Sequence, residues 1–118
     1  MKNNILNLFL FFATVAIVIY SCGKLPAQQA TNPAGGASVS IQNFAFVPDT
    51  VRIKVGQTIT WTNKDTAPHT STALAGAFNS GNLITNQTYQ FTFNAAGTYS
   101  YHCLVHPMMV TAYVIVTN

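Results

Sequence analysis

Charged side chains are scarce in this sequence. Of its 118 residues, 6% are Asp, Glu, Lys or Arg, with two acidic residues against five basic ones. A protein that binds nucleic acid needs clustered lysines or arginines to neutralise phosphates, so this composition argues against nucleic acid as a partner. The same scarcity predicts weak electrostatic steering toward a protein partner.

No apolar run is long enough to span a membrane as a helix. The longest, Ile5–Tyr20, has 16 residues, whereas a spanning helix needs about 20. Lys2 precedes this run and Ser21-Cys22-Gly23 follows it, which is typical of a secretory signal peptide. Ile19-Tyr20-Ser21-Cys22 resembles a bacterial lipobox, in which the cysteine is lipidated and begins the mature chain. We therefore expect residues 1–21 to be a lipoprotein signal peptide. An ordinary cleaved signal peptide or an uncleaved anchor is the alternative.

Residues 22–37 contain Pro, Gly, Gln and Asn and show no apolar period. Such a composition is typical of a flexible tether. The remaining residues, 38–118, are enough for one domain with a hydrophobic core, since 49% of the chain is hydrophobic. We therefore expect an exported bacterial protein whose domain is lipid-anchored to a membrane through Cys22 and faces the periplasm or the cell surface.

Cysteine is also scarce, because Cys22 and Cys103 are the only two. No Cys-x-x-Cys pair is present, which argues against a closed structural zinc site with four Cys or His ligands. With Cys22 lipidated, Cys103 has no disulfide partner. An unpaired thiol in an exported domain needs an explanation, and metal ligation supplies one.

Hydrophobic and polar residues alternate with a period of two through much of residues 38–118. This alternation predicts β-strands with one buried face, and no segment shows a convincing helical pattern. We therefore expect an all-β fold, an antiparallel β-sandwich, with loops and short strands across residues 66–84. The residues expected on the inner faces are Val51, Ile53, Val55, Ile59, Trp61, Tyr89, Phe91, Phe93, Tyr99, Tyr101, Cys103, Val110, Ala112, Val114 and Val116.

A group of metal-binding side chains follows one of these strands: Cys103, His106 and the pair Met108-Met109. Two histidines and a thiolate in a plane, with a weak axial methionine, are typical of a blue-copper electron-transfer site. The second histidine must come from elsewhere. His102 adjoins Cys103 on the strand and should point to the opposite face, which leaves His69.

Each of these residues also has a plainer interpretation. A single inward cysteine is more often an inert buried thiol. His69 could be a surface histidine. Met109 could be core packing, with Met108 as the axial ligand instead. His102 is expected to face solvent, with a place on an electron path through Cys103 as the alternative. The combined spacing of Cys, His and Met in one turn favours the metal site.

Four stretches of the chain resemble a family of small copper proteins. They are Phe46–Gln57, Trp61–Thr70, Gly97–Cys103 and His106–Met109. On these matches, the segment from Ser38 to Asn118 resembles a cupredoxin of the plastocyanin, amicyanin and pseudoazurin kind. The resemblance implies that family's Greek-key β-sandwich.

The resemblance also implies a ligand set and a function. The ligands of one copper ion, cycling between Cu(I) and Cu(II), would be His69, Cys103, His106 and Met109, with Met108 as a neighbour. The implied protein is not an enzyme. It is a type-1 copper electron-transfer protein that shuttles single electrons between exported redox partners, which dock transiently near His106. We expect a monomer. The alternative is a periplasmic copper carrier or buffer, which would use the same soft ligands.

One position departs from the family pattern. Many members have Asn directly after the first histidine ligand, and this chain has Thr70. A hydroxyl can still form a hydrogen bond, so we expect the geometry of the site to survive while the tuning of the copper changes.

Overall fold

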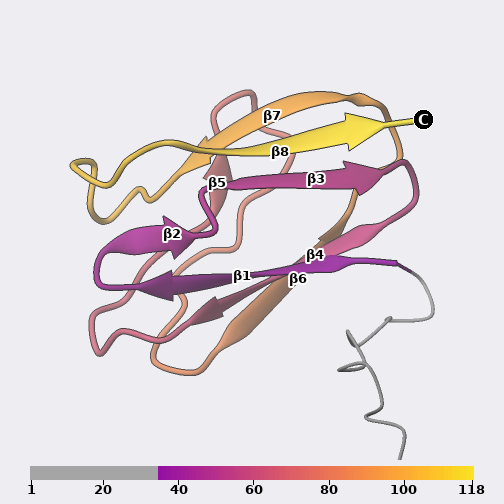
Figure 1. Ribbon diagram of the computed structural model, residues 1–118. Helices are drawn as coiled ribbons and strands as arrows, with labels where there is room; N and C mark the ends of the chain where they lie inside the picture. The colour runs from indigo at the N-terminus through magenta and orange to yellow at the C-terminus, as the bar shows by residue number, and fades with distance from the viewer. Residues whose placement is uncertain (1–34) are drawn as a thin grey trace, which may run out of the picture.

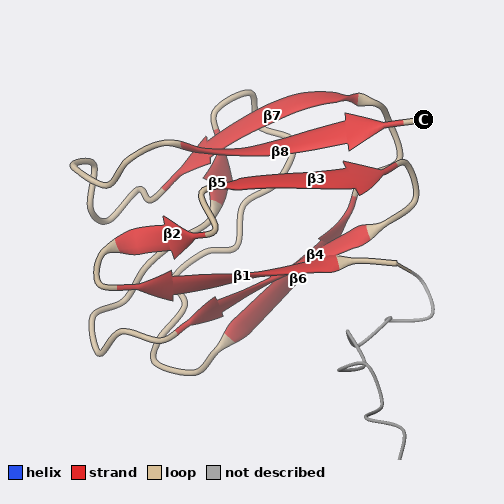
Figure 2. Cartoon of the chain, in the orientation of Figure 1, coloured by secondary structure: helices blue, strands red, loops and turns tan. Residues whose placement is uncertain are grey.

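The computed structural model describes residues 35–118, so the predicted signal peptide, Cys22 and most of the predicted tether lie outside the described residues. The described chain forms strands joined by turns and loops (Figure 2), and it holds no helix that could cross a membrane. The strands are β1 (Ala37–Gln42), β2 (Ala45–Val47), β3 (Thr50–Lys54), β4 (Thr58–Asn63), β5 (Thr72–Ala73), β6 (Thr88–Thr92), β7 (Gly97–His102) and β8 (Ala112–Thr117).

The strands form two sheets that pack face to face (Figure 1). One sheet has the strand order β2-β1-β4-β6 and the other β3-β8-β7-β5. The predicted all-β sandwich is confirmed. Buried and more exposed side chains alternate along β3, β4 and β8, as the sequence pattern predicts. In β6 the alternation is between half-buried and exposed residues.

The sheets are mixed, which corrects the expectation of a purely antiparallel sandwich. β1 pairs with β4 and β3 pairs with β8 in parallel, while the other four pairings are antiparallel. The reason is the path of the chain. After β2 it crosses to the second sheet as β3 and returns as β4 beside β1, running in the same direction. Alternation of side chains reports burial and not strand direction.

The core between the sheets is built around Trp61, which has no exposed surface. The centroid of its ring system lies 5.0 Å from that of Phe78, 5.5 Å from that of Tyr101 and 5.8 Å from that of Tyr89. Aromatic pairs of this kind each contribute about 0.5–1.5 kcal/mol beyond their burial. The other buried hydrophobic residues are Val39, Ile41, Phe46, Val51, Ile53, Ile59, Ala73, Leu83, Phe93, Cys103, Met109, Ala112, Val114 and Val116.

Two residues expected on the inner faces are exposed instead. Val55 is 39% exposed and Val110 is 73% exposed. Val55 follows the last residue of β3, and Val110 lies in the loop before β8. Both residues lie outside the strands, so the alternation of buried and exposed faces does not apply to their side chains.

The segment 66–84 is irregular, as predicted. Its one strand is β5, and isolated bridges join His69 to Leu83 and Thr72 to Asn79. The β1–β2 turn and the β7–β8 loop lie at one end of the sandwich, whereas the start of β1 and the C-terminus lie at the opposite end (Figure 1).

Candidate metal centre

Three of the four predicted metal ligands meet at the end of the sandwich. The ligand atoms of His69, Cys103 and His106 all lie within 4.8 Å of one another. Cys103 Sγ is 3.7 Å from His69 Nδ1 and 3.8 Å from His106 Nδ1, and the two Nδ1 atoms are 3.2 Å apart. Three donors about 2.0–2.3 Å from one ion, and roughly 105–120° apart around it, would be separated by about 3.2–3.8 Å. The spacing and the soft donor set therefore fit a single copper ion.

Cys103 reaches this position because it directly follows β7. Tyr101 and Cys103 are two residues apart and both point inward, with exposures of 0% and 1%. Burial raises the pKa of Tyr101 to about 12, so its ring stays neutral in the core. In the described chain Cys103 is a free cysteine. A thiol delivered by a core strand is held on a rigid element rather than a mobile loop.

Thr70 joins the two halves of the site. Its backbone amide donates to Cys103 Sγ at 3.4 Å, and its hydroxyl accepts a hydrogen bond from the Leu104 amide at 2.8 Å. Thr70 is 3% exposed, so both contacts are shielded from water. The prediction that a hydroxyl at this position still forms a hydrogen bond is confirmed.

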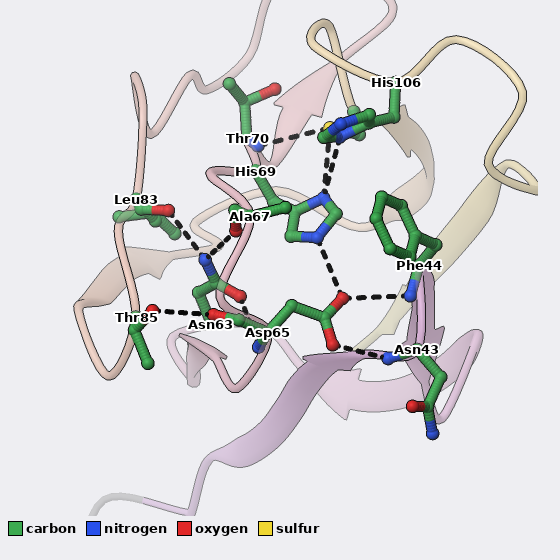
Figure 3. Close-up of polar contacts among 11 residues, drawn as sticks. Asn43, Phe44, Asn63, Asp65, Ala67, His69, Thr70, Leu83, Thr85 and His106 are labelled. Carbon is green, nitrogen blue, oxygen red and sulfur yellow. Dashed lines mark hydrogen bonds and ion pairs between the residues drawn. The ribbon is translucent and has the colours of Figure 1, made fainter.

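His69 is completely buried, which excludes the surface histidine considered from the sequence. Its backbone pairs with Leu83 through two hydrogen bonds of 3.1 and 2.8 Å. The ring turns Nδ1 toward Cys103 and His106 and Nε2 toward the carboxylate of Asp65, 2.9 Å away (Figure 3). One nitrogen is thus left for a metal while the other is occupied by a hydrogen bond.

Asp65 is a functional residue that the sequence interpretation missed. Burial alone would raise its pKa, but hydrogen bonds from the amides of Phe44 and Asn43 and the interaction with His69 outweigh that effect and lower the pKa below its ordinary value. The carboxylate is therefore charged and accepts from His69 Nε2. A signal was present in the sequence, since Asp65 is one of only two acidic residues and lies four positions before His69.

Phe44 covers the two histidine rings. Its ring meets that of His69 edge-on with centroids 5.2 Å apart, and that of His106 edge-on at 5.0 Å. It lies in the β1–β2 turn, where Asn43 and Phe44 both have positive φ, 53° and 57°. A left-handed pair of this kind is the turn that suits a tight hairpin between twisted strands.

The two candidate methionines are adjacent in the β7–β8 loop but differ in burial. Met109 is 7% exposed and its amide donates to the His106 carbonyl at 3.0 Å, whereas Met108 is 98% exposed. A surface pocket of about 360 Å³ opens beside them, lined by Phe44, Val105, His106, Pro107, Met108 and Met109. Burial thus favours Met109 over Met108 as a fourth ligand.

His102 is not brought into the group. It is half-buried on β7, where it pairs with Thr72 of β5. The remaining predicted site residue, Cys22, lies outside the described residues.

Comparisons with known proteins agree with this arrangement. A family model described as a cupredoxin-like domain matches residues 9–116. Amicyanin-alpha of Methylorubrum extorquens is 40% identical over 104 residues, which cover 84% of this chain and 84% of that protein. Amicyanin of Paracoccus versutus is 35% identical over 89 residues, or 71% of this chain and 67% of that protein.

A solved structure supports the same relationship. The Cu(I) form of an amicyanin mutant superposes with a TM-score of 0.65 at 35% identity, covering 70% of this chain and 83% of that one. The family model spans most of the sequence, and the first relative is similar over most of its own length. The protein therefore belongs to the cupredoxin-like family.

Proposed function

We propose that this protein is a one-electron carrier in which His69, Cys103, His106 and Met109 hold one type-1 copper ion. The observation that carries the proposal is the meeting of two imidazole nitrogens and one thiol sulfur within 4.8 Å in a cupredoxin-like chain. When bound, copper supplies a Cu(I)/Cu(II) couple that takes up and releases a single electron. A solved amicyanin structure with Cu(I) supports the choice of metal.

The protein's own residues hold the donor atoms in place. Leu83 pairs with the His69 backbone, Asp65 accepts from the His69 ring, and Thr70 links Cys103 to the loop that follows it. Such supporting contacts orient ligands and limit their movement. A site that moves little when its charge changes loses little energy to rearrangement, and this suits repeated electron transfer.

The electron would enter and leave at His106. This ring is half-buried and lines the surface pocket together with Phe44, Val105, Pro107 and Met108. An apolar rim around a partly exposed ligand suits a transient partner, whose interface would bury less than about 1,200 Å² in total. We infer that redox partners dock here and that the protein itself is monomeric.

The N-terminal region would export and anchor the protein. We infer that residues 1–21 are a lipoprotein signal peptide, that Cys22 carries the lipid and that residues 22–37 form the tether to the domain of residues 38–118. The first strand begins at Ala37, at the end of the sandwich opposite the metal centre (Figure 1). A tether of about 15 residues spans roughly 20 Å if flexible. The His106 pocket would then face away from the membrane, toward the periplasm or the cell surface.

A copper carrier or buffer is the second candidate, and the exposure of Met108 favours it. Met108 places a soft sulfur donor in solvent beside His106. A copper enzyme is a weaker candidate, because the sequence has three histidines and only His102 remains outside the metal centre for a substrate site.

The test is the visible spectrum of residues 23–118 loaded with Cu(II) and then reduced. The proposed carrier gives an intense blue colour from the bond between copper and thiolate, which bleaches on reduction and returns on oxidation. A colourless protein that binds Cu(I) tightly would support the copper carrier and contradict the electron carrier. For the anchor, the full chain is expected to partition into detergent, and the Cys22→Ala chain is expected to carry no lipid.

A further inference from the structure

The carboxylate of Asp65 is the junction of a network behind the metal centre (Figure 3). Its Oδ1 accepts from the Asn43 amide at 2.7 Å, and its Oδ2 accepts from the Phe44 amide at 2.9 Å and from His69 Nε2 at 2.9 Å. Three donors thus converge on one charged group. Two of them belong to a turn more than twenty residues away in the sequence.

The backbone of Asp65 is held as firmly as its side chain. Its amide donates to Asn63 Oδ1 at 2.9 Å, and its carbonyl accepts from the Thr85 hydroxyl at 2.8 Å. Asn63 is completely buried and donates in turn to the carbonyls of Ala67 and Leu83 at 2.8 Å each. The carboxylate therefore has little freedom to turn away from His69.

The charge of Asp65 is not neutralised by a basic side chain. Within residues 35–118, its one ion-pairing contact is with His69, and no Lys or Arg lies within 4.0 Å of its oxygens. The electric field of the carboxylate thus acts on the His69 ring and on what that ring binds. A carboxylate behind a ligating histidine fixes its tautomer and raises its basicity.

We propose that Asp65 is a positioning residue that holds His69 in the Nε2–H tautomer and lowers the reduction potential of the copper site, an inference that rests on the proposed function. The Nε2–H···Oδ2 hydrogen bond leaves the lone pair of Nδ1 facing Cys103 and His106. The oxidised site carries one more positive charge than the reduced site. A fixed negative charge behind a ligand stabilises the more positive form, and so makes reduction harder.

The same carboxylate also seats Phe44. By binding the Asn43 and Phe44 amides it holds the β1–β2 turn closed, and the Phe44 ring then lies over both histidine rings. Phe44 also lines the pocket beside His106. Asp65 therefore supports the histidine ligand on one side and the apolar cover of the site on the other.

The test measures the reduction potential of the copper-loaded Asp65→Asn protein, with Asp49→Asn as the matched control. Asp49 is the only other acidic residue of the chain, is exposed, and has no side-chain hydrogen bond within the described residues, so its replacement removes the same charge away from the site. We expect Asp65→Asn to remain blue and to raise the ratio of reduced to oxidised protein at least tenfold at a fixed solution potential. For one electron, tenfold corresponds to about 59 mV. Asp49→Asn should change that ratio less than threefold.

Two further measurements do not depend on a copper-loaded protein. In the metal-free wild type, nitrogen-15 NMR of the imidazole should show His69 as the Nε2–H tautomer. In metal-free Asp65→Asn, one carboxylate oxygen becomes an NH2 group that cannot accept a hydrogen bond. Oδ1 accepts one hydrogen bond and Oδ2 accepts two, so the NH2 group should take the place of Oδ1, where the contact with the Asn43 amide is lost. Hydrogen exchange at the Asn43 amide should therefore speed up at least tenfold.

The outcomes separate this inference from the proposed function. A blue Asp65→Asn protein with the same potential as Asp49→Asn, or a wild-type His69 in the Nδ1–H tautomer, overturns the role of Asp65. A wild type that never turns blue overturns the electron carrier, while the tautomer still decides whether Asp65 positions His69. If Asp65→Asn does not fold, Asp65→Glu is measured instead, because it keeps the charge. At a fixed solution potential, its ratio of reduced to oxidised protein should stay within threefold of the wild-type ratio.

Discussion

The backbone amide of Thr70 donates a hydrogen bond to the sulfur of Cys103, 33 positions further along the chain. The Thr70 hydroxyl then accepts from the amide of Leu104, the residue after that cysteine. One buried residue thereby connects the irregular segment that carries His69 to the strand end that carries Cys103. The precision of the metal centre depends on this link between two distant parts of the sequence.

Replacing Thr70 with Val should loosen that link without changing the shape of the side chain much. The Leu104 amide would lose its acceptor, at an expected cost of about 1–2 kcal/mol in the free energy of unfolding. Urea unfolding of the metal-free protein measures this cost. Thr70→Ser keeps the hydroxyl and is the control, and equal stability of the Val and Ser variants would contradict the role given to the hydroxyl.

Replacing Cys103 with Ser should abolish the blue colour and leave the sandwich intact. The substitution removes the thiolate but is nearly the same size, and the residue's packing against the core changes little. The measurements are the visible spectrum after copper loading and the circular dichroism of the β-sheet. A blue Cys103→Ser protein would show that the sulfur of Cys103 is not a ligand.

The two adjacent methionines should behave differently when each is changed to Leu. Met109 is buried, so Met109→Leu should alter the visible spectrum of the copper protein while costing less than about 1.5 kcal/mol of stability. Met108 is 98% exposed, so Met108→Leu should change neither property. A changed spectrum in Met108→Leu alone would reverse the assignment of the fourth ligand.

Replacing Trp61 with Ala should be among the most destabilising single changes in the domain. Trp61 is fully buried and packs against the rings of Phe78, Tyr89 and Tyr101, and its removal should cost about 3–5 kcal/mol. Thr60→Ala on the same strand is the control, because its half-buried side chain points away from the core. Thermal unfolding of the metal-free proteins compares the two, and similar melting temperatures would contradict the central place of Trp61.

Electron exchange with a protein partner should depend only weakly on ionic strength. The pocket beside His106 is lined by Phe44, Val105, Pro107 and two methionines and by no charged residue, so the approach of a partner is little steered by charge. Stopped-flow rates between 20 and about 500 mM salt should vary by less than a few-fold, since screening removes only electrostatic attraction. A steep fall with salt would place the docking site elsewhere.

The sequence alone determined the features that depend on neighbouring residues. Alternation specified which side chains of β4, β7 and β8 point inward, because successive residues of a strand face opposite sides. Cys103, His106 and Met109 lie in a single short turn, so their spacing already indicated a metal site. His69 followed by counting, since the chain has only three histidines. The lipid anchor at Cys22 stays a prediction.

The tertiary structure decided what depends on segments that are far apart in the chain. Alternation carries no information on strand direction, so the parallel pairings of β1 with β4 and β3 with β8 came only from the path of the chain. Met108 and Met109 are chemically identical, and only the packing of the loop buries one and exposes the other. Asp65 meets Phe44 across twenty-one positions because strand pairing brings the β1–β2 turn beside the end of β4. The histidine ligand could thus be identified from the sequence, whereas its carboxylate partner was revealed only by the fold.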